Sequence, residues 1–592
     1  MSNEELLAKI GQSKDEETEF YTPMPPGYRK GHHKYVVVVG TVMSGLGKGI
    51  FASSLAKLLQ DKGLKVAPIK MEGYLNIDSG TLNPYRHGEV FVLDDGMETD
   101  MDLGTYERLL DQDLSAANFT TNGQVLSQVL KKEREGGYLG RDVQVIPHLT
   151  GEIKLKLREL AVKSDADVVF VEVGGTVGDY ENSFYLEACR QLAFEEGEGS
   201  VVFVALTYVL EPNALGEQKS KAAQLGIQRL MEVGIMPHIV ACRARNVVGD
   251  KVRQKISMYT NVPMRRVFSM HDVESIYVIP ESLREAGMDR EVLTLLDLHE
   301  RVDQRKEDQA RMKWRWFVER IGKARKDVTI AVTGKYTALR DAYASIIKAC
   351  EHCGVHQGVN INFKWLDTTT IDATNVDKRL GDCDGIIVPG GFGVRGTEGK
   401  IDCIRYAREN KVPYLGLCLG FQMAVIEFAR NVCGIADANS TEFDPRAINA
   451  VIDILPEQKK IEGLGGNMRL GGKDVEIKPE TIAAKLFENS ATLFDAHPRI
   501  RLRFRHRYEV DPRYIDTLES HGLVFSGKHP TQPIMQILEL PPDVHPYFLG
   551  TQAHPELTSR PLRPQPMFMG FIQAAMEHHG KTRAHRPQPQ TV

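Results

Sequence analysis

The sequence lacks the features that define a membrane-spanning, secreted or nucleic-acid-binding protein. No apolar run reaches the roughly 20 residues needed to span a bilayer. The polar and charged stretch from Met1 to Lys34 has no apolar core of the kind found in signal peptides. The formal net charge of −5 shows no large excess of either sign. We therefore expect neither nucleic acid nor a membrane as a partner.

Cysteine is scarce, with eight residues in 592, and no spacing is typical of a metal site. Cys350 and Cys353 form a single C-x-x-C pair, which lies in a helical pattern and has no second pair. Free thiols persist in a reducing environment, so we predict a cytoplasmic protein. The length allows two or three domains with full cores.

Two successive alternations of strand and helix patterns organise the chain. The first begins at Tyr35-Val-Val-Val-Val39 and the second at Asp327-Val-Thr-Ile-Ala-Val332, and such runs are typical of buried parallel strands. This pattern predicts two doubly wound α/β domains. The predicted divisions are a flexible N-terminal extension (1–33), a first domain (34–300), an interdomain linker (301–326), a second domain (327–580) and a disordered tail (581–592).

The second domain contains a cysteine between a strand pattern and a helix pattern. The run Tyr414-Leu-Gly-Leu417 leads into Cys418, which has a glycine two residues away on each side, and a helical pattern follows from Phe421 to Arg430. This order is typical of a nucleophile elbow, in which glycines clear space for a strained turn. The helix dipole then favours the thiolate. The alternative interpretation is an ordinary buried cysteine of the core.

Two distant stretches favour the nucleophile. Pro389-Gly-Gly-Phe-Gly393 follows an apolar strand pattern and can offer backbone N–H groups to an oxyanion, and His554-Pro-Glu556 supplies a base with a carboxylate to orient it. With Cys418, these stretches resemble the class I glutamine amidotransferases. The resemblance implies that Cys418 attacks the side-chain amide of glutamine, that His554 moves the proton, that Glu556 holds the imidazole and that ammonia is released. It places Gly391 in the oxyanion hole. The residues that it implies for holding glutamine are Leu419, Gly420, Phe421, Gln422, Glu442 and Arg507.

The first domain opens with a glycine-rich loop between a strand and a helix. The loop Gly40-Thr-Val-Met-Ser-Gly-Leu-Gly-Lys48-Gly49 precedes a helical pattern from Ile50 to Lys62. Backbone N–H groups, the helix dipole and the lysine would together cradle phosphates. The loop is two residues longer than a strict P-loop, and Gly49 replaces the usual Ser or Thr. An ordinary strand–helix turn is the alternative.

Carboxylates near this loop suggest a magnesium site. Glu172 lies inside the apolar strand pattern Val168-Val-Phe-Val-Glu-Val173, where a charge is costly unless it is paired or bound to metal. Asp102 lies in a carboxylate-rich stretch, and Lys70 ends the second strand pattern. Because magnesium favours few carboxylates together with phosphate oxygens, Asp102 and Glu172 are the predicted ligands.

Six stretches, in this order before the amidotransferase motifs, are similar to the CTP synthase family. They are Ser44-Gly-Leu-Gly-Lys48-Gly-Ile, Tyr74-Leu-Asn-Ile-Asp78, His87-Gly-Glu-Val-Phe91, Tyr138-Leu-Gly140, Val143-Gln-Val-Ile-Pro-His148 and Glu172-Val-Gly-Gly-Thr-Val-Gly-Asp179. The resemblance covers residues 34–575 approximately. It implies an N-terminal P-loop-like synthetase domain and a C-terminal flavodoxin-like amidotransferase domain. In such enzymes ATP phosphorylates the 4-oxygen of UTP, and ammonia from glutamine displaces the phosphate to give CTP.

The resemblance also implies ligands and partners for individual residues. ATP would be bound by Gly45, Leu46, Gly47, Lys48, Gly49, Lys70, Asp102, His271, Asp272 and Val273, and magnesium by Asp102 and Glu172. UTP or CTP would be bound by Ser44, Asp179, Tyr180, Glu181, Lys219, Ser220, Lys221, Ala222, Ala223, Gln224 and Lys255. GTP is the implied activator, CTP the implied inhibitor, and a homotetramer whose interface builds the UTP site is the implied assembly.

The sequence departs from the family pattern in three places. Lys219-Ser-Lys-Ala-Ala-Gln224 replaces Lys-Thr-Lys-Pro-Thr-Gln, Lys70-Met-Glu-Gly-Tyr74 replaces Lys-x-Asp-Pro-Tyr, and Thr120-Thr-Asn-Gly-Gln124 replaces Thr-Thr-Gly-Lys/Arg. Loss of the proline and threonine at Ala222 and Ala223 predicts weak CTP inhibition.

Three alternatives stand beside an ordinary member of the CTP synthase family, and the departures motivate the first of them. The first is a specialised paralogue with relaxed feedback or a modified pyrimidine substrate. The second is a non-catalytic regulatory or filament-forming subunit, and the third is another glutamine-dependent ligase such as a cobyrinate amidase. A non-catalytic subunit has no physical need for all six of the residues that argue against it, which are Cys418, His554, Glu556, Lys48, Asp102 and Glu172.

Overall fold

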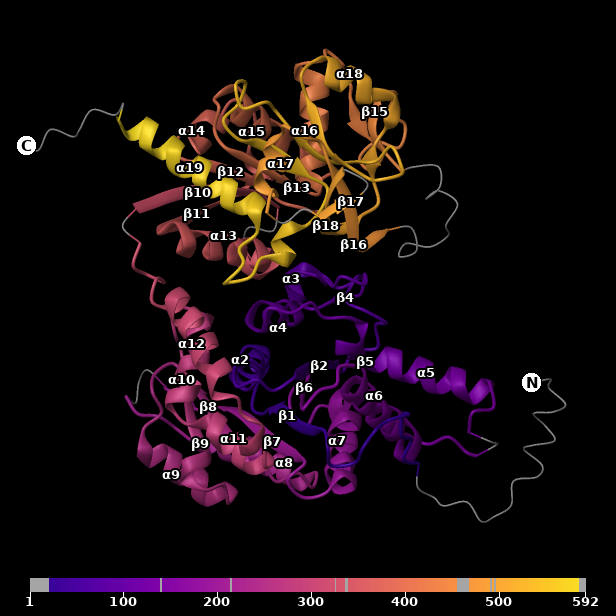
Figure 1. The fold of residues 1–592 in the computed structure, drawn as a ribbon, viewed down its shortest axis with the longest axis vertical. Coiled ribbons are helices and arrows are strands. Elements are labelled where there is room, and N and C mark those ends of the chain that lie inside the picture. The colour runs from indigo at the N-terminus through magenta and orange to yellow at the C-terminus, as the bar shows by residue number, and fades with distance from the viewer. Residues whose placement is uncertain are drawn as a thin grey trace, which may run out of the picture. The chain divides into compact units, whose positions relative to one another are not determined.

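The contacts of the chain divide it into two compact α/β units (Figure 1). The computed structural model describes residues 21–138, 141–212, 216–324, 326–335, 339–454, 468–489, 492–494 and 497–584. The first unit contains residues up to Thr81 together with Thr105–Val318, and the second contains Leu82–Gly104 together with the chain from Glu319 onward. No helix in these described ranges is both long and apolar enough to cross a membrane.

A seven-stranded parallel sheet forms the centre of the first unit. Its order is β5-β2-β6-β1-β7-β8-β9, and each neighbouring pair is parallel. The strands are β1 (Lys34–Gly40), β2 (Val66–Glu72), β5 (Phe119–Thr121), β6 (Val168–Val173), β7 (Val201–Tyr208), β8 (Ile239–Ala244) and β9 (Val267–His271). Because the strands are parallel, the loops that follow them gather at one edge of the sheet, where open α/β sheets bind ligands.

Helices connect successive strands of this sheet and bury its faces. The helices of the first unit are α2 (Lys48–Asp61), α5 (Asn122–Arg134), α6 (Thr150–Lys163), α7 (Ser183–Glu196), α8 (Lys221–Glu232), α9 (Asp250–Thr260), α10 (Ile279–Glu285), α11 (Met288–Leu296) and α12 (Gln304–Val318), and α4 (Met101–Leu110) crosses the division between units. Val37, Val171, Leu157 and Leu192 are fully buried in the resulting core.

A ten-stranded mixed sheet forms the centre of the second unit. Its order is β11-β10-β12-β13-β22-β21-β20-β16-β18-β17, of which the first five strands are parallel to one another. The strands are β10 (Lys326–Gly334), β11 (Val359–Asp367), β12 (Gly385–Val388), β13 (Tyr414–Leu417), β16 (Arg469–Ile477), β17 (Thr492–Phe494), β18 (His497–His506), β20 (Val524–Lys528), β21 (Met535–Glu539) and β22 (Phe548–Thr551). The longer helices are α13 (Ala344–Gln357), α15 (Thr397–Glu409), α16 (Leu419–Asn431) and α19 (Pro566–Ala584). The prediction of two α/β domains is confirmed.

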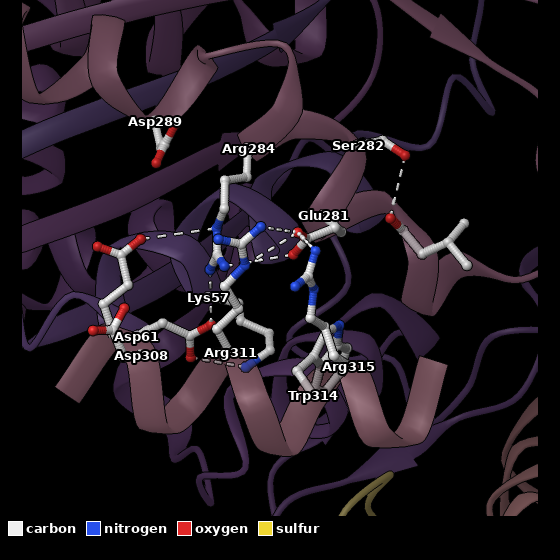
Figure 2. A network of polar contacts seen from close by, with 12 residues as sticks. Lys57, Asp61, Glu281, Ser282, Arg284, Asp289, Asp308, Arg311, Trp314 and Arg315 are labelled. Carbon is white, nitrogen blue, oxygen red and sulfur yellow. Dashed lines mark hydrogen bonds and ion pairs between the residues drawn. The ribbon is translucent and has the colours of Figure 1, made fainter. Parts of the chain in front are cut away.

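The structure differs from the linker predicted at residues 301–326. Helix α12 packs against α2, where Trp314 is 4% exposed and Phe317 is fully buried. The ammonium of Lys57 lies 4.2 Å from the centroid of the Trp314 ring. Figure 2 shows the polar network around this contact. Residues 301–318 are therefore part of the first unit.

The two predicted terminal segments also differ from the structure. Residues 21–33 are not a free extension, because Tyr21 Oη donates to Glu152 Oε1 at 2.5 Å and Arg158 Nη1 donates to Pro23 O at 3.5 Å. At the other end, helix α19 continues past the predicted boundary at residue 580. Residues 1–20 and 585–592 lie outside the described residues.

Residues 82–104 were predicted within the first domain, yet they make their contacts in the second unit. They form α3 (Pro84–His87) and the hairpin of β3 (Phe91–Val92) and β4 (Glu98–Thr99). Glu89 accepts from Ser345 N at 2.9 Å, and Glu98 accepts from Arg505 Nε at 2.7 Å. Contacts between residues so distant in sequence cannot be read from local patterns.

Candidate active sites

Cys418 occupies a strained turn between β13 and α16. Its φ of 50° and ψ of −98° lie outside the regions that side chains prefer, at a cost of about 1–3 kcal/mol. The positions two residues before and after it must be glycine, because a methyl group on Gly420 would lie 2.1 Å from Val388 O, and one on Gly416 would lie 2.2 Å from Tyr414 Oη. The turn therefore has the geometry of a nucleophile elbow.

His554 and Glu556 face this cysteine. His554 Nδ1 lies 2.7 Å from Glu556 Oε1, and Glu556 is 5% exposed. Burial alone would lower the pKa of His554, but the charges of Glu556 and Cys418 and their hydrogen bonds raise it to about 10. The arrangement thus favours an imidazolium beside Cys418 Sγ, and a histidine adjacent to a cysteine is the usual activating partner of a thiol nucleophile.

The loop at residues 389–393 lies against the same group. A methyl on Gly390 would lie 2.9 Å from His554 Cε1 and 3.5 Å from Cys418 Cβ, while one on Gly391 would lie 3.7 Å from Leu419 Cδ2. The loop and the first turn of α16 are therefore adjacent. Backbone N–H groups at a helix start have no partner within the helix, so this is a suitable place for an oxyanion.

Two buried lysines that the sequence analysis missed support this loop. Lys335 donates to Phe392 O, and Lys400, which is 1% exposed, donates to Pro389 O at 3.3 Å. Burial and the nearby charge of Lys335 lower the pKa of Lys400 to about 7. Lys335 comes directly after β10 and Lys400 lies on α15, but neither lysine belongs to a recognisable sequence motif. Only their burial in the structure identifies them.

Glu442 and Arg507, both predicted to hold glutamine, lie close enough for the charge of Arg507 to act on the Glu442 carboxyl group. Gly393 N donates to Glu442 Oε1 at 2.6 Å. Burial raises the pKa of Glu442, and the Gly393 N–H and the charges of Lys335 and Arg507 oppose that shift. A carboxylate and a guanidinium at one site are complementary to the ammonium and carboxylate of a free amino acid.

A buried chain of amides leads from Gln422 to the cysteine. Gln422 Nε2 donates to Gln552 Oε1 at 3.1 Å, and Gln552 Nε2 donates to Cys418 Sγ at 3.5 Å. Gln552 was missed by the sequence analysis, although its place two residues before His554 was a usable signal. The side chains of Leu419 and Phe421 pack in the core, so these residues can meet a ligand only through their backbone.

The glycine-rich loop of the first unit has the form expected of a phosphate-binding loop. Gly45 and Gly47 have φ values of 74° and 79°, which glycine adopts without strain, and α2 begins directly after Gly47. Lys48 is 9% exposed and donates to Gly175 O at 2.5 Å. The lysine is thus held between the ends of β1 and β6, at the helix N-terminus where phosphates bind.

Glu172 is fully buried near the end of β6, and both of its carboxylate oxygens make contacts. Its Oε1 lies 2.7 Å from Lys70 Nζ, and its Oε2 accepts from Tyr106 Oη at 3.0 Å. Lys70 also lies 3.3 Å from Glu72 Oε1. Among the described residues no three His, Cys, Asp or Glu side chains cluster as a metal site. A carboxylate such as that of Glu172, combined with the phosphate oxygens of a nucleotide, would nevertheless provide the oxygen ligands that magnesium prefers. The other predicted ligand, Asp102, lies in the first turn of α4, within the segment that packs with the second unit.

The residues predicted to bind the pyrimidine nucleotide lie at strand ends of the first unit. Asp179, Tyr180 and Glu181 follow β6 and are exposed. Lys219 pairs with Glu217, whose pKa is lowered by this contact and by the nearby charge of Lys255. Three further cationic or polar residues, Ser220, Lys221 and Gln224, lie at or near the start of α8.

The structure does not support the sequence argument that the loss of proline and threonine at Ala222 and Ala223 removes a hydroxyl contact with the nucleotide. Ala223 is fully buried in the core, so its side chain does not reach a ligand, and Ala222 is half-buried. A threonine hydroxyl at position 223 would enter the core.

The residues predicted near adenine, His271, Asp272 and Val273, lie at the end of β9, where Asp272 pairs with Arg243 at 2.8 Å.

Comparisons with known proteins cover both units. Residues 34–298 match the family model described as CTP synthase N-terminus, and residues 338–574 match that described as glutamine amidotransferase class-I. The CTP synthase of Thermococcus gammatolerans is 48% identical over 545 residues, which are 92% of this chain and 99% of that protein. The CTP synthase of Thermus thermophilus is 46% identical over 550 residues, 92% of this chain and 97% of the relative.

Among solved structures, the glutaminase domain of Trypanosoma brucei CTPS with bound acivicin is 37% identical. The match covers 42% of this chain and 94% of that domain, with a TM-score of 0.39.

Proposed function

The chain belongs to the CTP synthase family, whose members use ATP and glutamine to convert UTP to CTP, and we propose how its own residues divide that reaction. The observation that carries the proposal is the buried group of Cys418, His554 and Glu556 at a strained strand–helix turn. The comparisons lend no support to a non-catalytic subunit, to a specialised paralogue or to another ligase.

In the second unit, Cys418 Sγ attacks the side-chain carbonyl carbon of glutamine. The N–H groups of Gly391 and Leu419 stabilise the tetrahedral oxyanion, and His554 donates a proton to the departing ammonia. Glu556 keeps the imidazole oriented and charged. Water then hydrolyses the thioester and glutamate leaves. Glu442 holds the ammonium and Arg507 the carboxylate of the substrate.

In the first unit, the loop from Gly45 to Gly49 holds the ATP phosphates, and Lys48 and Lys70 neutralise their charge. Phosphorylation of the 4-oxygen of UTP turns a poor leaving group into phosphate, which ammonia displaces. Asp179 to Glu181, Lys219 and Lys255 hold the pyrimidine nucleotide. Positioning and charge neutralisation supply nearly all of the catalysis in such phosphoryl transfers.

Magnesium is proposed beside the ATP phosphates. Glu172 would be one ligand and Asp102 the other, because carboxylate and phosphate oxygens form its preferred set. When bound, the ion neutralises charge that develops on the transferred phosphoryl group. Lys70 and Tyr106 keep the Glu172 carboxylate oriented for this role.

Activation by GTP, a homotetrameric assembly and a cytoplasmic location are proposed from family membership. The eight cysteines are all free thiols, in keeping with a reducing environment. Exposed apolar side chains near the pyrimidine residues, such as Tyr180 at 90% and Leu75 at 69% exposure, are compatible with subunit contacts there.

Two reciprocal variants test the division of labour. Cys418→Ala should abolish CTP formation from glutamine but retain at least about half of the activity with free ammonia, because the phosphoryl-transfer residues are untouched. Lys48→Ala should lower CTP formation from either nitrogen source by at least about a hundredfold while glutamine hydrolysis persists. CTP and glutamate formation would be measured for both. Loss of ammonia-dependent synthesis in a folded Cys418→Ala protein would contradict the proposal.

A further inference from the structure

Two of the places where the sequence departs from its family meet in space. Strands β2 and β5 are parallel neighbours, with Glu72 in register with Thr121. The residues that follow them, Gly73 and Asn122, therefore leave the sheet side by side. Gly73 stands where the family pattern has proline, and Asn122 lies in Thr-Thr-Asn-Gly where the pattern has Thr-Thr-Gly.

A third segment completes this contact. Asn122, the first residue of α5, is 4% exposed, and its amide donates to Gly73 O at 2.7 Å and to Glu181 O at 2.6 Å. Both amide hydrogens are thus used. The absent side chain of Gly73 makes room for the contact, because a methyl group there would lie 2.9 Å from Glu181 Cβ. The two departures are complementary: one residue supplies the donors and the other supplies the space.

The carbonyl of Glu181 belongs to the segment proposed to hold the pyrimidine nucleotide. The inner side of that segment is held by Asn182, whose amide donates to Gly174 O and Thr176 O at 3.1 and 2.9 Å. The outer residues project outward, with Tyr180 90% exposed. Asn122 therefore fixes the outer end of the segment to the central sheet.

We propose that Asn122 is a positioning residue for the pyrimidine nucleotide, acting through the backbone of residues 179–181. The inference rests on the pyrimidine role proposed for that segment. The two hydrogen bonds from Asn122 would orient Asp179 and Glu181 toward UTP, and toward CTP in the same pocket. ATP, held at the glycine-rich loop and Lys70, would not sense it.

The variant Asn122→Leu removes both donors and keeps the branching and the number of heavy atoms of the side chain. We expect the KM for UTP to rise about tenfold, in line with the loss of two buried hydrogen bonds, with kcat and the KM for ATP changed less than about twofold. If this variant does not fold, Gly73→Ala moves the same backbone by contact with Glu181, and its KM for UTP should rise by about threefold or more.

Asn118→Leu is a matched control. Asn118 is also buried, and its amide donates to Pro68 O at 2.7 Å on the same strand β2, while its side-chain oxygen accepts from Ser115, so its hydrogen bonds serve a different part of the chain than residues 179–181. It should lower the unfolding temperature as Asn122→Leu does and leave the KM for UTP unchanged. An equal rise in the KM for UTP in Asn118→Leu, or an equal rise in the KM for ATP in Asn122→Leu, would overturn the inference.

Glu181→Ala separates this inference from the proposed function. A raised KM for UTP in Glu181→Ala, with unchanged values in Asn122→Leu and Gly73→Ala, would overturn only the positioning role of Asn122. An unchanged KM for UTP in Glu181→Ala and in Asp179→Ala would mean that the pyrimidine segment itself is misassigned, and the inference would fall with it.

Discussion

His554 is largely buried, and its charge depends on its neighbours. Burial opposes the imidazolium, and the charges of Glu556 and Cys418 outweigh burial, so the pKa rises from 6.5 to about 10. A raised histidine pKa stabilises the folded state fully below pH 6.5, and the stabilisation is lost as the pH rises toward 10. The same contact therefore contributes to catalysis and to a pH-dependent part of the stability.

Glu556→Gln should remove this effect at nearly constant shape. We expect glutamine hydrolysis to fall by at least about a hundredfold, because the imidazole loses its orienting charge. The unfolding temperature of the variant should lie furthest below that of the wild type near pH 6, and the gap should narrow toward pH 10. Thermal unfolding at several pH values tests this, and a gap that stays constant or widens would contradict the assigned pKa. Ammonia-dependent synthesis serves as the activity control.

The sequence could predict Cys418, His554 and Glu556 because each lies in a short local pattern. It could not predict Lys335 or Lys400, which reach the site only through burial and proximity created by the fold, whereas Gln552 was missed although it lies two residues before His554. It also led to a hydroxyl-based argument at Ala223 that the structure does not support, because that side chain faces the core.

At the scale of elements, helix α12 shows how a highly charged sequence can bury one face. The one charged residue buried on this helix, Glu307, lies 2.5 Å from Lys62. Arg311 of the same helix pairs with Glu281 at 2.6 Å (Figure 2), and Arg305, Lys306, Asp308, Lys313 and Arg315 are exposed. A single-sequence pattern cannot distinguish such paired charges from solvated ones. The strands were easier to predict, because continuous β-branched runs such as that of β1 bury almost every residue.

Two tryptophans of α12 give a matched test of its packing. Trp314 is 4% exposed and donates to Tyr277 O at 3.0 Å, whereas Trp316 is 40% exposed. Trp314→Ala should destabilise the first unit by about 3–5 kcal/mol, because it opens a cavity and removes a hydrogen bond. Trp316→Ala should cost less than about 1 kcal/mol. Urea unfolding of both variants decides the matter, and equal small losses would show that α12 is only a linker.

At the scale of the whole molecule, the position of a segment in the sequence does not always match the unit in which it packs. Residues 82–104 lie in sequence among the motifs of the first domain and carry the proposed magnesium ligand Asp102, but they pack with the second unit. Their partners are charged residues of β18, more than 400 positions away: Glu98 pairs with Arg505 and Asp94 with Arg501. No periodicity or local motif encodes such a pairing.

The Glu98–Arg505 pair connects this segment with the glutaminase residues. The guanidinium of Arg505 lies 5.3 Å from the centroid of the Phe392 ring, in the proposed oxyanion loop, and its carbonyl oxygen lies 3.7 Å from Cys418 Sγ. Glu98 is 7% exposed, so removing it would leave a largely buried guanidinium without this partner. A displaced Arg505 would disturb the loop and the cysteine together.

Glu98→Ala should therefore lower glutamine-dependent CTP formation by about tenfold while ammonia-dependent formation falls less than about twofold, because a small displacement of the loop misplaces its N–H donors. Asp94→Ala is the matched control, since it also breaks an ion pair of this segment with β18, but the Asp94–Arg501 pair is more exposed, at 35% and 53% of the two side chains, and therefore more screened by solvent. The ratio of the two activities would be measured for each variant. If Asp94→Ala lowers that ratio as much as Glu98→Ala does, the segment supports the second unit only as a whole. If only Glu98→Ala lowers it, the segment reaches the glutaminase site through Arg505.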